Sequence, residues 1–125
     1  MTAKEGKKTS GQQAEEAAAR YLERRGVRIT DRNVFSRGGE LDLIGMDDGV
    51  LVFFEVRYRG NGSYSTSAES ISYRKQQRLL KAAALYLQRH GLWNAPTRID
   101  VIAMAPGFVK QYRIQWIKNA IQANS

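Results

Sequence analysis

The sequence contains no cysteine among its 125 residues, and its single histidine is His90. The absence of cysteine excludes disulfide bonds and thiolate metal sites, and it fits a reducing compartment. No apolar run approaches the ~20 residues that a membrane-spanning helix needs, and residues 1–8 lack the apolar core of a signal peptide. We therefore expect a cytoplasmic protein that does not cross a membrane.

Acidic residues are also scarce, since 12 Asp and Glu stand against 20 Lys and Arg, which gives a net charge of +8. This excess favours a polyanionic partner, nucleic acid first and an anionic membrane second. Residues 40–55 hold five acids and no Lys or Arg, whereas residues 57–118 hold eleven Lys or Arg and two acids. An acidic patch within a basic surface suits an enzyme that holds phosphates and binds a cation at one point. A solvated basic face with ordinary acidic turns explains the same distribution.

The chain length suits one domain with a single modest core. We expect this domain to span residues 11–121, between a disordered basic tail at residues 1–10 and a C-terminal tail at residues 122–125.

The pattern of apolar residues predicts the order α-β-β-β-α-β-β-α. The predicted elements are a helix at 11–25, strands at 27–34, 40–46 and 50–59, a long helix at 68–90, strands at 97–104 and 110–115, and a short closing helix at 116–121. The Asp-Asp-Gly run at residues 47–49 is a hairpin signal that makes the second and third strands neighbours. This order predicts an α/β fold with a mixed sheet flanked by helices.

Carboxylates interrupt the apolar pattern of the second and third strands. Side chains alternate along a strand, so Glu40 and Asp42 share one face of the second strand, and Glu55 and Arg57 share one face of the third. The hairpin allows Asp42 and Glu55 to lie across from each other. Two adjacent carboxylates repel and one would take up a proton, a conflict that a divalent cation removes.

Oxygen ligands without His or Cys favour a hard ion, so we expect Mg²⁺ or Mn²⁺ as the cofactor. Such an ion can gather phosphate oxygens and lower the pKa of a bound water, and Arg57 would neutralise charge on the phosphate. On the first helix, Glu15 lies at the edge of the apolar stripe and is the acid of that helix able to lean toward the core. The structural alternative is a plain ion pair between Glu55 and Arg57, with Glu40 closing a turn.

The runs at residues 38–44 (GGELDLI) and 53–59 (FFEVRYR) closely resemble the YraN family of small bacterial proteins, over roughly residues 11–121. That family is described as having an endonuclease-like fold, similar to archaeal Holliday-junction resolvases and restriction-type nucleases. The resemblance therefore implies a restriction-endonuclease-like fold and metal-dependent cleavage of structured DNA. It also implies that Asp42 and Glu55 are metal ligands, that Glu15 is a third carboxylate, and that Arg57 occupies the position of a catalytic lysine. Glu40 matches the family pattern as well, without a defined role.

Arg57 opens a second interpretation. A buried lysine can lose its proton and so activate a water, whereas arginine stays charged. The alternative function is therefore a non-catalytic nucleic-acid-binding protein that retains the nuclease fold, and a protein-binding scaffold is a third option. Resolvase-like relatives often work as dimers because a symmetric junction needs two cuts, so the resemblance also implies a homodimer as a candidate assembly.

The second long helix carries basic residues opposite its apolar face, and such a stripe can track a phosphate backbone. We expect contacts with nucleic acid, DNA before RNA, from a set of basic residues in this helix and at the end of the third strand: Arg59, Arg74, Lys75, Arg78 and Lys81. A solvated helix face explains these residues equally well. Gln76 points into the apolar face, where an amide needs a hydrogen-bond partner, and it is a candidate for a supporting role.

Overall fold

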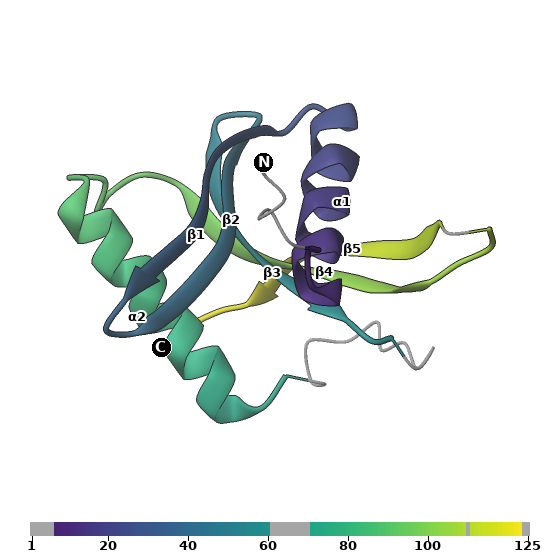
Figure 1. Cartoon of the computed structure of the whole chain (residues 1–125). Coiled ribbons are helices and arrows are strands. Elements are labelled where there is room, and N and C mark those ends of the chain that lie inside the picture. Colours follow the sequence, from purple (N-terminus) through teal and green to yellow (C-terminus); the bar gives the residue numbers. More distant parts are fainter. Residues whose placement is uncertain (1–6, 61–70, 110, 124–125) are drawn as a thin grey trace, which may run out of the picture.

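The computed structural model describes residues 7–60, 71–109 and 111–123. Part of each expected tail, the expected helix start at residue 68 and the expected strand start at residue 110 lie outside these described residues. The elements are α1 (Ser10–Arg24), β1 (Arg28–Ser36), β2 (Gly39–Asp47), β3 (Val50–Tyr58), α2 (Tyr73–Arg89), β4 (Thr97–Pro106) and β5 (Tyr112–Ile121). Five strands form one mixed sheet in the order β1-β2-β3-β4-β5, flanked by the two helices (Figure 1). The predicted fold class is confirmed.

Helix α1 begins where the sequence supplies a capping box. The Thr9 hydroxyl accepts a hydrogen bond from the Gln12 N–H, and the Gln12 side chain accepts one from the Thr9 N–H. This arrangement satisfies donors that the first helical turn leaves open. Ala18 and Leu22 then bury one stripe of the helix against the sheet, which leaves Glu15 half-buried at the edge of that stripe.

The first three strands form the predicted meander, with β3 at the centre of the sheet. The turn between β2 and β3 is tight because Asp48 and Gly49 both have positive φ, +52° and +85°, as two-residue hairpin turns require. Antiparallel pairing of these strands runs without interruption as far as Leu43 opposite Phe54. Helix α2 then crosses from β3 to β4, which pairs with β3 in parallel.

The sheet carries an apolar layer on each face because neighbouring side chains along a strand alternate. Phe53 packs in the layer under α2, and Phe54 packs in the layer with α1. Helix α2 is also tied to the edge strand, since the Tyr86 hydroxyl donates a 2.7 Å hydrogen bond to Asp31. Burial and this hydrogen bond raise the pKa of Tyr86 to about 12. Neither helix of the described residues has the length and apolar character that crossing a bilayer demands.

The predicted closing helix at residues 116–121 is wrong, because these residues continue the last strand, β5. Strand β5 pairs antiparallel with β4 almost from end to end, with one irregularity between Ile99 and Val101. Aromatic and β-branched residues such as Trp116 and Ile117 suit a strand. Periodicity alone cannot distinguish a helix from a strand in so short an apolar run, and the pairing with β4 decides between them.

A buried carboxylate fixes the end of β5. Asp100 has no exposed surface, and it accepts hydrogen bonds from the Trp116 ring N–H at 2.8 Å and from the Asn119 backbone N–H at 2.7 Å. The Arg98 Nε donates to both oxygens of the same carboxylate, at 3.0 and 3.1 Å. These hydrogen bonds satisfy the buried charge of Asp100, and they hold residues 116–119 in the strand rather than in the predicted helix.

Replacing Asp100 by asparagine should lower the free energy of unfolding by about 3 kcal/mol, because Arg98, the Trp116 ring N–H and the Asn119 N–H all lose a buried charged acceptor. Chemical denaturation followed by circular dichroism measures this change. Asp48→Asn in the exposed turn removes the same charge and is the matched control, with an expected change within about 0.5 kcal/mol. Equal stabilities of the two variants would contradict the role assigned to Asp100.

Candidate functional site

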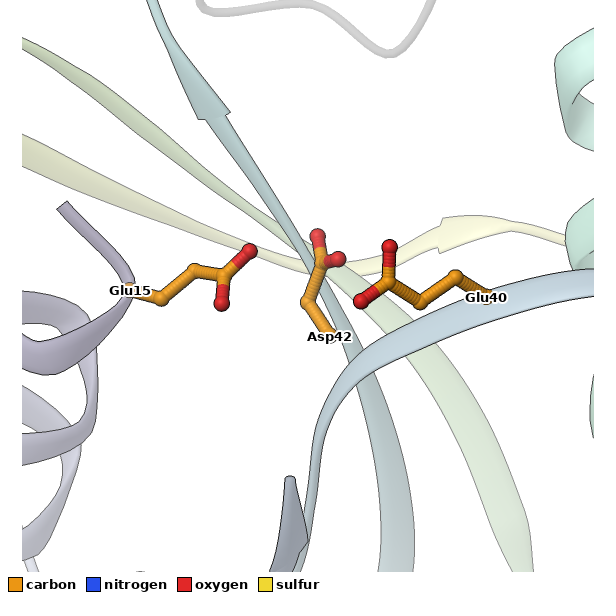
Figure 2. A group of neighbouring side chains, drawn as sticks. All are labelled: Glu15, Glu40 and Asp42. Carbon is orange, nitrogen blue, oxygen red and sulfur yellow. The ribbon is translucent and has the colours of Figure 1, made fainter. Parts of the chain in front are cut away.

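Three carboxylates from two elements converge beside strand β2. Glu15 reaches in from α1, Glu40 comes from the opposite side, and Asp42 lies between them (Figure 2). Carboxylate oxygens, one from each residue, all lie within 4.8 Å of one another. We call Glu15, Glu40 and Asp42 the carboxylate cluster, and it could hold a metal ion.

Asn33 of the edge strand β1 bridges the outer members of the carboxylate cluster. Its side-chain amide donates to Glu15 Oε1 and to Glu40 Oε2, both at 2.9 Å. The φ angle of Asn33 is +49°, a left-handed conformation that asparagine adopts more readily than most residues. Sequence reasoning missed Asn33, and the available signal was an asparagine inside a strand pattern.

Asp42 is the central and least exposed member, with 9% of its surface exposed. Its Oδ2 accepts a 2.9 Å hydrogen bond from the Val56 backbone N–H. Burial raises the pKa of Asp42 to about 8, and the neighbouring charges of Glu55 and Glu15 add to this effect against the hydrogen bond from Val56. A cation beside Asp42 would favour its ionised form. The cluster offers oxygen ligands alone, so its chemistry fits a hard divalent ion.

Glu55 adjoins the carboxylate cluster through Asp42, whose pKa it raises. It is buried on β3, one position beyond the last ladder pair of β2 and β3. Its Oε2 lies 3.4 Å from Lys75 Nζ of α2. The sequence predicted Asp42, Glu55 and Glu15 as the metal ligands. In the structure, Glu40 takes the place of Glu55 in the carboxylate cluster, and Glu55 forms an ion pair with Lys75.

Arg57 lies near the end of β3, and Gln76 lies in the first turn of α2. Burial lowers the pKa of half-buried Arg57, the charge of Arg59 lowers it further, and Glu55 opposes both effects. The Gln76 side chain donates a 2.9 Å hydrogen bond to the Ile71 carbonyl, which gives this amide a partner at the start of α2.

The basic residues of α2 border the acidic site. Lys75 and Arg78 line a hollow of about 250 Å³ together with Glu40 of the carboxylate cluster. The other residues expected to contact nucleic acid are exposed to solvent: Arg59, Arg74 and Lys81. Helix α2 therefore brings positive charge to the edge of the carboxylate cluster, where a polyanion could be held.

Comparisons with known proteins cover almost the whole chain. The family model described as "Uncharacterised protein family UPF0102" matches residues 14–104. A UPF0102 protein of Marinobacter nauticus is 59% identical over 122 residues, 98% of this chain and 99% of the relative. A UPF0102 protein of Stutzerimonas stutzeri is 45% identical over 117 residues (92% and 96%), and one of Symbiobacterium thermophilum is 45% identical over 113 residues (90% and 96%). The matched region contains all the carboxylates of the site.

The raised pKa of Asp42 predicts how stability depends on pH. Because the pKa of Asp42 is about 8 in the folded protein and 3.8 is ordinary for an aspartate, the folded protein holds a proton that the unfolded chain releases. The free energy of unfolding should therefore fall as the pH rises, by roughly 2 to 4 kcal/mol between pH 5 and pH 8.

Asp42→Asn removes this titration and keeps an acceptor for Val56. In EDTA, this variant should lose most of the pH dependence and should be more stable than the wild type at pH 8. Chemical denaturation at both pH values provides the measurement, with Asp48→Asn as the control of equal charge. Parallel pH profiles for the wild type and Asp42→Asn would rule out the predicted protonation.

Proposed function

The chain belongs to the uncharacterised protein family UPF0102, the YraN family, and from the site that it carries we propose a metal-dependent nuclease-like protein that acts on structured DNA in the cytoplasm. The observation that carries this proposal is the convergence of Glu15, Glu40 and Asp42 next to the basic helix α2. The proposed partner is nucleic acid, DNA before RNA, and the proposed assembly for paired cuts is a homodimer.

The carboxylate cluster supplies the ligands that this chemistry needs. Oxygen-only ligands are those that Mg²⁺ and Mn²⁺ prefer. A divalent ion bound by Glu15, Glu40 and Asp42 would hold phosphate oxygens and lower the pKa of a water. Asn33 orients the outer carboxylates by hydrogen bonds, in the way that residues around metal ligands commonly do.

Basic residues would hold the phosphate while the ester bond breaks. Lys75 forms an ion pair with Glu55, and its ammonium group can donate instead to a phosphate oxygen that enters the hollow. Arg57 stays charged throughout and would stabilise negative charge on the phosphate. In the reaction, the oxygen of a water bonds to phosphorus and one phosphorus–oxygen ester bond breaks. The departing oxygen takes up a proton to become a hydroxyl, and the product phosphate releases a proton to solvent.

The nuclease proposal predicts cleavage of branched or flayed duplexes in the presence of Mg²⁺ or Mn²⁺ and none in EDTA. Asp42→Asn, Glu40→Gln and Glu15→Gln should each lower the cleavage rate by about 100-fold or more, since they weaken metal binding. Glu23→Gln, at an exposed acid of α1, is the matched control for Glu15→Gln and should leave the rate unchanged. Denaturing gels of end-labelled strands measure the cuts. Wild-type protein that cuts none of these substrates, or an Asp42→Asn variant that cuts at the wild-type rate, would refute this proposal.

A second candidate is a nucleic-acid-binding protein that retains the fold without cleaving. The observation in its favour is that three acids of the site already have protein partners without a metal ion. Asn33 donates hydrogen bonds to Glu15 and Glu40, and Lys75 forms an ion pair with Glu55. The presence of arginine at position 57 points in the same direction.

The second candidate predicts salt-sensitive binding in EDTA that survives Asp42→Asn. Arg74→Gln/Arg78→Gln should weaken this binding, because each lost phosphate contact removes part of the counterion release. Fluorescence anisotropy with labelled four-way, duplex and single-stranded DNA measures the affinity. Metal-dependent product formation by the wild type would exclude the non-cleaving protein, and equal weak affinity for any polyanion would indicate a scaffold.

A further inference from the structure

A second basic surface lies on the side of α1 away from the carboxylate cluster. It is a groove of about 700 Å³ between α1 and the first residues of β5. Of its eight lining residues, three are arginines and none is acidic. We call it the α1–β5 groove, and the residues that matter here are Arg20, Tyr21, Arg24, Arg25 and Tyr112.

The α1–β5 groove is separate from the carboxylate cluster. Glu15 lies two residues before Ala17 of the groove, which places the two side chains about 200° apart around the helix. Glu15 contacts Asn33 on β1, whereas the groove contacts Tyr112 on β5, the opposite edge strand. The body of α1 therefore stands between the two surfaces.

The positive charge of the groove is poorly neutralised by the protein. Among the ion pairs of the described residues, none involves Arg20, Arg24 or Arg25. Glu16 is the acid one turn before Arg20, and its lowered pKa is due first to Lys8, with which it forms an ion pair, and only in lesser part to Arg20. Arg24 and Arg25 are exposed residues and can meet an external anion.

Aromatic contacts organise this surface for phosphate. The Arg25 guanidinium carbon lies 3.7 Å from the centroid of the Tyr21 ring. A guanidinium held over a ring keeps its in-plane N–H groups, which match the two oxygens of a phosphate. Tyr112, on the other wall, is held edge-to-face against Tyr58 with ring centroids 5.8 Å apart.

We propose that the α1–β5 groove binds the phosphate backbone of a nucleic-acid segment other than the one at the carboxylate cluster. Arg20 and Arg24 are one helical turn apart, about 6 Å along the axis, so both side chains can reach phosphates of the same backbone. A groove admits a narrow chain of regularly spaced phosphates, whereas a flat membrane surface cannot enter it. Surfaces on opposite sides of α1 suit a branched nucleic acid, whose arms diverge.

The inference shares its nucleic-acid partner with the proposed function, but it requires neither metal nor cleavage. The test is therefore fluorescence anisotropy of the full chain with a labelled four-way junction, linear duplex and single strand, all in EDTA. The variant is Arg24→Gln/Arg25→Gln. The matched control is Arg28→Gln/Arg89→Gln, which removes the same two charges from exposed positions elsewhere.

Loss of two phosphate contacts should weaken binding roughly tenfold and lower the salt slope of log K by about 1.4 on single strands and about 1.8 on duplex. The control should change the affinity by about twofold at most, because its charges act at a distance in salt. Arg24→Lys/Arg25→Lys keeps the charge and removes the paired donors, so it should bind between the wild type and Arg24→Gln/Arg25→Gln. Thermal unfolding verifies that each variant is folded, and the lysine variant replaces the glutamine variant if the latter unfolds.

Equal DNA affinities of Arg24→Gln/Arg25→Gln and of its control would overturn the inference. So would a loss of binding by Arg24→Gln/Arg25→Gln that is seen with anionic lipid vesicles or polyglutamate and not with DNA. The Arg74→Gln/Arg78→Gln variant separates the two surfaces. A loss of binding confined to this α2 variant overturns the groove and leaves the proposed function standing. A groove effect without any metal-dependent cleavage supports the groove and contradicts the nuclease.

Discussion

Buried carboxylates on neighbouring strands repel, and the structure around the site depends on how this repulsion is relieved. The protein relieves it with a side-chain amide, a lysine ammonium group and a backbone N–H. The Asn33 amide binds Glu15 and Glu40, and Lys75 pairs with Glu55. Asp42 accepts a hydrogen bond from the Val56 N–H, while burial and the adjacent charge of Glu55 raise the pKa of Asp42. These groups come from β1, α2 and β3, and the acids themselves come from α1, β2 and β3. The acidic site therefore joins five of the seven elements of the described residues.

The topology brings these groups to one place. The tight hairpin sets β2 beside β3 in a register that puts their acids next to each other. The crossover from β3 to the parallel β4 lays α2 over the sheet, so a helix with a basic exposed side begins next to the acids. Helix α1 covers the other face and contributes a carboxylate at one flank and arginines at the other. Negative charge is thus enclosed by the fold, and positive charge surrounds it.

Much of this arrangement could be predicted from sequence because local signals specify it. The Asp-Asp-Gly turn predicts the hairpin, and helical spacing predicts that Glu15 leans toward the core. The grouping of Glu40 with Glu15 depends on Asn33, whose left-handed backbone leaves little trace in a strand pattern. The contact of Lys75 with Glu55 joins residues that are distant in sequence. The helix predicted at residues 116–121 is wrong for the same reason, because Asp100 and the pairing with β4 are non-local.

We propose that a divalent cation completes the carboxylate cluster. A crystal structure of the protein soaked in Mn²⁺, with the ion located by its anomalous scattering, tests this claim most directly. We expect one strong anomalous peak in contact with oxygens of Glu15, Glu40 and Asp42. A structure at saturating Mn²⁺ in which the peak lies elsewhere, and the Asn33 bonds and the carboxylates are unchanged, would contradict it.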